Sequence, residues 1–183
     1  CSAGPGFART LTDQLDRTIE VPKSLNRILS LAPSITECLF ALDQGDKVIG
    51  VTQFSDYPDK AAKLPKVGSY VNLNLEKIVA LEPELCIGTK DGNPGSVITR
   101  LEKLGVPVYA VDPRDLFAVI DTLQELGELL GAREKASQVT SDMRQRIEVV
   151  SSAVASTSRR PRVFFQIGIS PIVSVGTDTF IHE

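Results

Sequence analysis

Short apolar runs alternate with amphipathic segments along most of this 183-residue chain. Five runs are almost continuously apolar, which is typical of parallel strands covered on both faces. They lie at residues 27–31, 48–52, 85–88, 106–111 and 162–168. Segments with helical spacing lie between them, at residues 34–42, 75–81 and 94–104, and Asn93 is the expected cap of the last. This alternation predicts an α/β fold with a parallel, Rossmann-like sheet and right-handed crossovers.

The pattern changes after residue 115. One helix is predicted to end at Gly131, and a second covers residues 133–157. The second would be roughly 37 Å long at 1.5 Å per residue. Its apolar residues form a single stripe, which predicts a helix that lies across a domain surface rather than inside a core. They are Ala136, Val139, Met143, Ile147, Val150 and Val154.

Four parts follow from these patterns. We expect an N-terminal tether over residues 1–15, an N-terminal α/β lobe over 16–114 and a helical connector over 115–160. Residues 161–183 would begin a second α/β lobe with a strand and a β-prone run. Because they end while entering a helical pattern, we expect that second lobe to be incomplete.

Composition excludes several classes of protein. A net charge of −3 and a pI near 5.3 argue against a nucleic-acid binder, which normally has a basic face. No apolar run approaches the ~18 residues that cross a bilayer. Three cysteines without CxxC spacing and a single histidine make a zinc site improbable, and we expect no metal or cofactor. Cys38 and Cys86 are predicted to be small buried apolar residues rather than a disulfide.

Ser34 follows the first predicted strand of the sheet and could be a nucleophile, an anion-binding group or a helix cap. Ser34 and Glu37 have the S-x-x-E spacing of a capping box directly before an apolar helical run. A G-x-S-x-G elbow is absent, and the sole histidine is His182, near the chain end. The pattern therefore favours a helix cap, and we expect no catalytic residues.

Loops that follow the predicted strands hold the candidate ligand contacts, because open α/β sheets bind ligands at the carboxyl ends of their strands. Phe54, Tyr57 and Tyr70 lie in two such loops, in a chain with only 5% aromatic residues and no Trp. Aromatic rings gathered there predict a stacking surface for a flat or bulky ligand. For Tyr57, packing within its own loop is an equal alternative. Pro33 and Ser34 are expected on the floor of the same site.

Several segments resemble the substrate-binding proteins of cobalamin and iron-siderophore ABC importers. The resemblance rests on "SLAPSITE", "SDYP" and "NLEKIVALEPEL", in this order and spacing, and on "RVFFQIG" further along. It implies two α/β lobes joined by one long helix, with a chelate captured between the lobes. It implies no enzymatic activity.

The resemblance also implies partners and a location. Such receptors work outside the cytoplasm and deliver their ligand to a membrane permease, and the docking acid of the "NLE" motif falls on Glu76. Cys1, followed by small residues, matches the acylated cysteine of a mature lipoprotein, which would be the contact with the membrane. An arbitrary chain boundary is the alternative for Cys1. Two chains could pair to cover the hydrophobic edge that the missing part of the second lobe leaves exposed.

The ligand is not fixed by the resemblance. Cobalamin comes first, but Thr89 stands where cobalamin binders have a tryptophan. A ferric siderophore or haem is the close alternative, and Lys90 and Arg114 would be the basic contacts to an anionic chelate. A sensor or docking module with a decayed ligand site is a further alternative. Asp16 and Asp43 replace glycines that are usual in the family, which predicts altered turns but unchanged ligand contacts.

Overall fold

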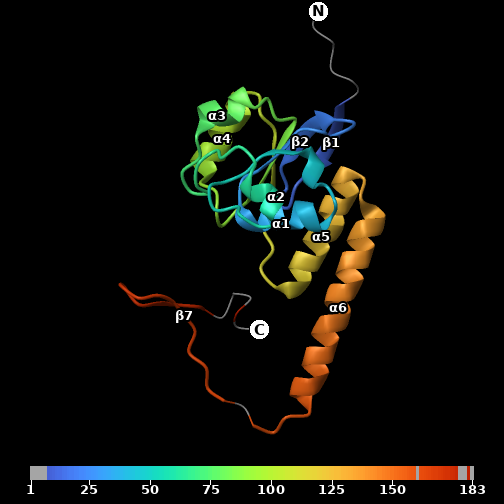
Figure 1. Ribbon diagram of the computed structural model, residues 1–183, viewed down its shortest axis with the longest axis vertical. Coiled ribbons are helices and arrows are strands. Elements are labelled where there is room, and N and C mark those ends of the chain that lie inside the picture. The colour runs from blue at the N-terminus through green and yellow to red at the C-terminus, as the bar shows by residue number, and fades with distance from the viewer. Residues whose placement is uncertain (1–7, 160, 177–180, 182–183) are drawn as a thin grey trace, which may run out of the picture.

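The computed structural model describes residues 8–159, 161–176 and 181 (Figure 1). A four-stranded sheet lies at its centre, with every pairing parallel. The strand order is β4 (Val48–Gly50), β3 (Ile28–Ser30), β5 (Leu85–Thr89) and β6 (Val108–Val111). The predicted parallel α/β fold is thereby confirmed. Strands β3, β4 and β6 are shorter than their predicted runs, and β5 extends one residue beyond its own.

Helices cover both faces of this sheet, which is why its strands are apolar on both sides. Helices α1 (Pro33–Ala41) and α5 (Leu116–Leu130) pack on one face, with strand residues such as Ile28 and Ile87. Helices α3 (Leu75–Ala80) and α4 (Gly95–Lys103) pack on the other. Two further short helices lie in the connections: the 3-10 turn η1 (Gly45–Lys47) and α2 (Asp59–Ala62).

An antiparallel hairpin precedes the sheet and corrects the expected tether. Strand β1 (Ala8–Thr12) pairs with β2 (Thr18–Pro22) over its whole length. The connection between the two strands is bound to the edge of β6, because the Gln14 N–H donates to the Ala110 carbonyl at 3.2 Å. The tether prediction is therefore wrong for residues 8–12, while residues 1–7 lie outside the described part of the chain.

The long helix is present as α6 (Arg133–Ala155), directly after α5 (Figure 1). Only its first half packs on the lobe: Ala136 and Thr140 are buried, whereas Val150 and Val154 are exposed. Strands β7 (Gln166–Gly168) and β8 (Val173–Ser174) form a short exposed hairpin beyond it. The strand predicted over residues 162–168 is thus confined to its last three residues. Among the described residues, no helix is long and apolar enough to cross a membrane.

Two helix starts differ from the sequence-based expectation. Helix α1 begins at Pro33, its N-cap is Ala32, and no side chain caps it. Proline is favoured at the first helical position, so the helix starts one residue earlier than Ser34 and the capping-box prediction is wrong. Helix α4 begins at Gly95 and has no side-chain cap either. Asn93, the expected cap, uses its side chain elsewhere.

Helix α5 has a side-chain cap at its start, and its predicted end at Gly131 is confirmed. The Asp115 carboxylate caps α5 by accepting from the Ala118 N–H at 2.7 Å. Gly131 ends the same helix with a left-handed φ of 73°. Asp16 and Asp43 also have left-handed φ values, 58° and 57°, so they keep a backbone conformation that favours glycine. Both aspartates thus stand in the left-handed conformation that a glycine adopts easily.

Candidate functional site

The candidate site lies at the carboxyl edge of the sheet, where β3 and β5 are neighbours. The chain leaves β3 into α1 on one face and leaves β5 through a loop into α4 on the opposite face. When the connections from two adjacent strands leave to opposite faces of the sheet, a crevice opens between the strand ends. Open α/β sheets bind their ligands in such a crevice. The predicted loops therefore surround a topological switch point.

Pro33 and Ser34 stand at this edge, in the first turn of α1. Pro33 is half-buried and Ser34 is exposed. The Ser34 hydroxyl caps no helix. Both residues thus lie at the edge of the sheet where the predicted loops gather, with Ser34 in the first helical turn rather than as a cap.

The aromatic pair is the most distinctive feature of the site. The rings of Phe54 and Tyr70 meet edge to face, with centroids 6.4 Å apart and an interplanar angle of 62°. Phe54 is 54% exposed and Tyr70 is 39% exposed. Tyr57, in the Phe54 loop, is also exposed. The structure therefore brings together two of the three predicted rings and leaves their surfaces open to a partner.

A buried hydroxyl cluster supports the Phe54 loop from below, and sequence reasoning missed it. The Thr36 hydroxyl in α1 lies 2.8 Å from that of Ser30 and 3.0 Å from that of Ser55. The Ser55 hydroxyl in turn lies 2.9 Å from that of Thr52. All four residues are buried. Because unpaired hydroxyls are costly inside a protein, this cluster fixes the loop against the ends of β3 and α1.

A lysine holds the same loop from its other side. The Lys66 ammonium donates to the Ser55 carbonyl at 2.7 Å and to the Ala61 carbonyl at 3.2 Å. Burial lowers the pKa of Lys66, although the negative charge of Asp56 acts in the opposite direction and raises it. Phe54 therefore stands on a loop with anchors on two sides.

Lys90 and Arg114 share one carboxylate. Lys90 Nζ lies 2.9 Å and Arg114 Nη2 lies 3.0 Å from Asp112 Oδ2. Burial alone would raise the pKa of Asp112, but hydrogen bonds from the two cations outweigh it and hold that pKa below its usual value. The two predicted basic contacts are thus brought together, yet Asp112 neutralises part of their charge.

Glu76 is exposed in the first turn of α3. Asn74 caps this helix by accepting from the Lys77 N–H at 2.9 Å. A carboxylate in the first turn is favourable to the helix dipole whatever else it binds.

Of the three cysteines, Cys1 lies outside the described residues. Cys38 and Cys86 are free thiols, as predicted, but only Cys86 is fully buried. Partial burial raises the pKa of Cys38 to about 11.

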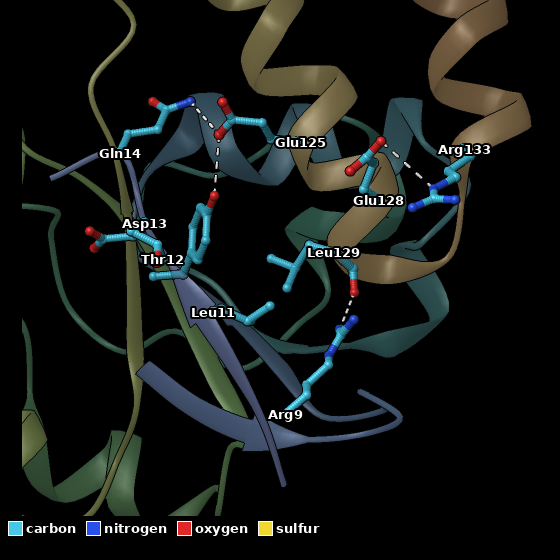
Figure 2. A pocket seen from close by; sticks show the side chains of 10 residues that line it. Arg9, Leu11, Thr12, Asp13, Gln14, Glu125, Glu128, Leu129 and Arg133 are labelled. Atoms are coloured by element: carbon cyan, nitrogen blue, oxygen red, sulfur yellow. Dashed lines mark hydrogen bonds and ion pairs between the residues drawn. The ribbon is translucent and has the colours of Figure 1, made fainter. Parts of the chain in front are cut away.

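A separate pocket of about 360 Å³ lies between β1, β6 and the C-terminal half of α5 (Figure 2). Most of its polar groups are paired with one another, although Arg9 Nε is buried without a hydrogen-bond partner in the described part of the chain. Glu125 accepts from Gln14 at 2.8 Å and from the Tyr109 hydroxyl at 3.2 Å, and Arg9 donates to the Leu129 carbonyl. Burial, followed by the nearby Glu125 carboxylate, raises the pKa of Tyr109. These contacts join the hairpin to α5, so we assign the pocket a structural role.

Comparisons with known proteins agree with this architecture. The family described as "Periplasmic binding protein" matches residues 28–183. The vitamin B12-binding protein of Yersinia pestis (strain Pestoides F) is 33% identical over 161 residues, which are 88% of this chain and 57% of that protein. The chain thus spans little more than half the length of this relative.

Solved structures give the same result. The periplasmic vitamin B12-binding protein of Vibrio cholerae superposes with a TM-score of 0.78 at 32% identity, over 87% of this chain and 62% of that one. A periplasmic haem-binding protein from Pseudomonas aeruginosa superposes with a TM-score of 0.72 at 32% identity, over 79% and 53%. By sequence and by fold, the chain belongs to the periplasmic binding protein family.

Proposed function

We propose that this chain is the substrate-binding component of an ABC importer and that its loops capture cobalamin. The exposed Phe54–Tyr70 pair at the switch point carries the proposal. Two aromatic rings on anchored loops offer a large apolar contact at little cost in conformational entropy. A corrin macrocycle is a flat, bulky ligand of the kind that such rings bind.

Haem is the second candidate. Solved haem-binding proteins from Pseudomonas aeruginosa and Roseiflexus, at 32% and 27% identity, support it. Cobalamin comes first because the curated relative at 33% identity carries the name vitamin B12-binding protein. An anionic ferric siderophore comes third, since Lys90 and Arg114 already share Asp112.

A second lobe, of which β7 and β8 are the first strands, would close over the ligand. The connector from α5 through α6 would join the two lobes. Such a receptor works outside the cytoplasm and passes its ligand to a permease, and a lipid on Cys1 would hold it at the membrane. Glu76, exposed on the lobe surface, would form a salt bridge with an arginine of the permease.

Titration calorimetry with cyanocobalamin, haemin and a ferric siderophore tests the ligand. Cyanocobalamin should bind most tightly, and Phe54→Ala or Tyr70→Ala should each weaken it by roughly tenfold, which corresponds to 1.4 kcal/mol. Leu104→Ala is a matched control, because this exposed residue ends α4 at the opposite edge of the sheet. Tight binding that neither aromatic variant changes would rule out the proposed site.

Complex formation with the permease tests Glu76 separately. Glu76→Ala should weaken the complex and leave cyanocobalamin affinity unchanged, because the carboxylate lies on the surface outside the aromatic pair. Glu20→Ala, at an exposed position on β2, is the control. A protein that binds none of the three chelates but still binds the permease would be a docking module instead.

A further inference from the structure

Asn93 occupies the crevice of the switch point. It lies in the loop between β5 and α4 and is only 6% exposed. Its side chain makes three hydrogen bonds, each to a different segment around the site. This arrangement is not that of a helix cap, because no N–H of α4 is among the partners of its side chain.

The three bonds use both amide hydrogens and the amide oxygen. Asn93 Oδ1 accepts from the Thr89 N–H at 2.9 Å, at the end of β5. Asn93 Nδ2 donates to the Leu31 carbonyl at 2.9 Å, just after β3, and to the Tyr70 carbonyl at 2.8 Å. Both amide hydrogens are therefore committed, and one buried group joins β3, β5 and the Tyr70 loop.

Two glycines leave room for this arrangement. A Cβ on Gly88 would lie 2.5 Å from Asn93 Oδ1, so a larger residue there would displace the amide. A Cβ on Gly92 would lie 2.9 Å from Thr89 Cγ2 and 3.4 Å from Tyr70 Cδ2. The ring and the amide are thus packed closely against a backbone that carries no side chain at these two points.

The Tyr70 loop depends on this contact at its tip. Its base is tied to the lobe, since the Gln53 N–H donates to the Gly68 carbonyl at 2.8 Å and the Asn74 N–H donates to the Val67 carbonyl at 2.8 Å. The bonds between Ser69 and Asn72 stay within the loop itself. The Asn93 amide is what links the tip to the strand ends.

We propose that Asn93 is a positioning residue that holds Tyr70 in place for the ligand. This inference rests on the proposed function, because it assigns a role within the same site. Asn93 does not contact the ligand; it fixes the backbone that carries the Tyr70 ring. Preorganisation of this kind removes an ordering cost from ligand binding.

Two variants separate the roles of the Asn93 side chain as hydrogen-bond donor and as acceptor. Asn93→Ala removes all three bonds, and Asn93→Asp at pH 8 keeps the acceptor for Thr89 but removes the two amide donors. Asn72→Ala is the matched control, the same substitution at an exposed position of the Tyr70 loop. Circular dichroism verifies that each variant is folded.

Backbone NMR provides a readout that needs no ligand. In Asn93→Ala, the order parameter of Tyr70 should fall from about 0.85 towards about 0.6, and exchange of the Thr89 amide should accelerate. In Asn93→Asp, the Tyr70 loop should become mobile while the Thr89 amide stays protected. Asn72→Ala should change neither value. An unchanged Tyr70 order parameter in both folded Asn93 variants would overturn the proposal.

A double-mutant cycle then tests the link to the ligand. Asn93→Ala should lower cyanocobalamin affinity by roughly tenfold in the native background but by less than about twofold beside Tyr70→Ala. An equal loss in both backgrounds would mean that Asn93 acts through the lobe as a whole, and would overturn the proposal. If the native protein bound neither cyanocobalamin nor haemin, the proposed function would fail, while the order parameters would still decide the positioning role.

Discussion

Asp13 is the buried group that fastens the β1–β2 hairpin to the edge of β6. Its Oδ1 accepts from the backbone N–H groups of Leu15 and Arg17, at 3.0 and 2.9 Å. Its Oδ2 accepts from the Arg17 guanidinium at 2.9 and 2.6 Å and from the Ala110 N–H at 3.1 Å. Asp13→Asn keeps the shape of the side chain but removes its charge and turns one acceptor into a donor.

The expected loss in the free energy of unfolding is about 3 kcal/mol. Breaking a buried ion pair by removing one partner costs about 3–5 kcal/mol, because the other charge is left uncompensated. The lower end applies, since Arg17 is 30% exposed and keeps Glu102 and the Val108 carbonyl as partners. This loss lowers the ratio of folded to unfolded protein by roughly 150-fold.

The effect should depend on pH. Burial alone would raise the pKa of Asp13, but hydrogen bonds from the Arg17 side chain and from three backbone groups outweigh it, so that pKa lies below its usual 3.8. A carboxyl group with a lowered folded-state pKa contributes stability above its unfolded pKa and loses it as the pH falls through the folded value. The difference between native protein and variant should therefore be full at pH 7 and shrink below about pH 4.

Urea unfolding followed by circular dichroism at several pH values measures both effects. Asp16→Asn is the matched control: it is the same substitution in the same connection, at an exposed residue whose left-handed φ asparagine tolerates. We expect it to change stability by less than about 0.5 kcal/mol. If Asp13→Asn unfolded at the same urea concentration as the native protein, or if its deficit did not change with pH, the reasoning about Asp13 would be refuted.

Two other substitutions test the packing around the site. Thr36→Val should cost about 1–3 kcal/mol by urea unfolding, because Ser30 and Ser55 would lose a buried hydroxyl partner; an unchanged midpoint would contradict a structural role for the cluster. Gly131→Ala should cost about 1 kcal/mol in a thermal melt, because its φ of 73° disfavours a Cβ although the space is open. A larger cost would indicate a packing clash that the structure does not contain.

Much of the lobe could be predicted from local patterns. Continuous apolar runs marked β3, β4, β5 and β6 because both faces of the sheet are covered, and Gly131 marked the end of α5. The β1–β2 hairpin was missed because "ARTLT" is short and mostly polar, and its anchor through Asp13 lies about a hundred residues away in β6. Local patterns carry no information about such distant partners.

The site was predicted only in outline, for the same reason. Phe54 and Tyr70 could be selected by residue type and loop position, but their mutual contact needed the fold. Asn93 looked like a helix cap because it precedes Pro94, and two of its three real partners, Leu31 and Tyr70, are distant in sequence. Ser34 fitted a capping box, yet Pro33 takes the first helical position and displaces it.

The claim that Phe54 and Tyr70 receive the ligand is tested most directly by calorimetry. Cyanocobalamin is titrated into the native protein and into a Phe54→Ala, Tyr70→Ala double variant. The native protein should bind the corrinoid, and the double variant should bind it at least about tenfold more weakly while keeping the same circular dichroism spectrum. Equal affinity of the two proteins would contradict the claim that this aromatic pair receives the ligand.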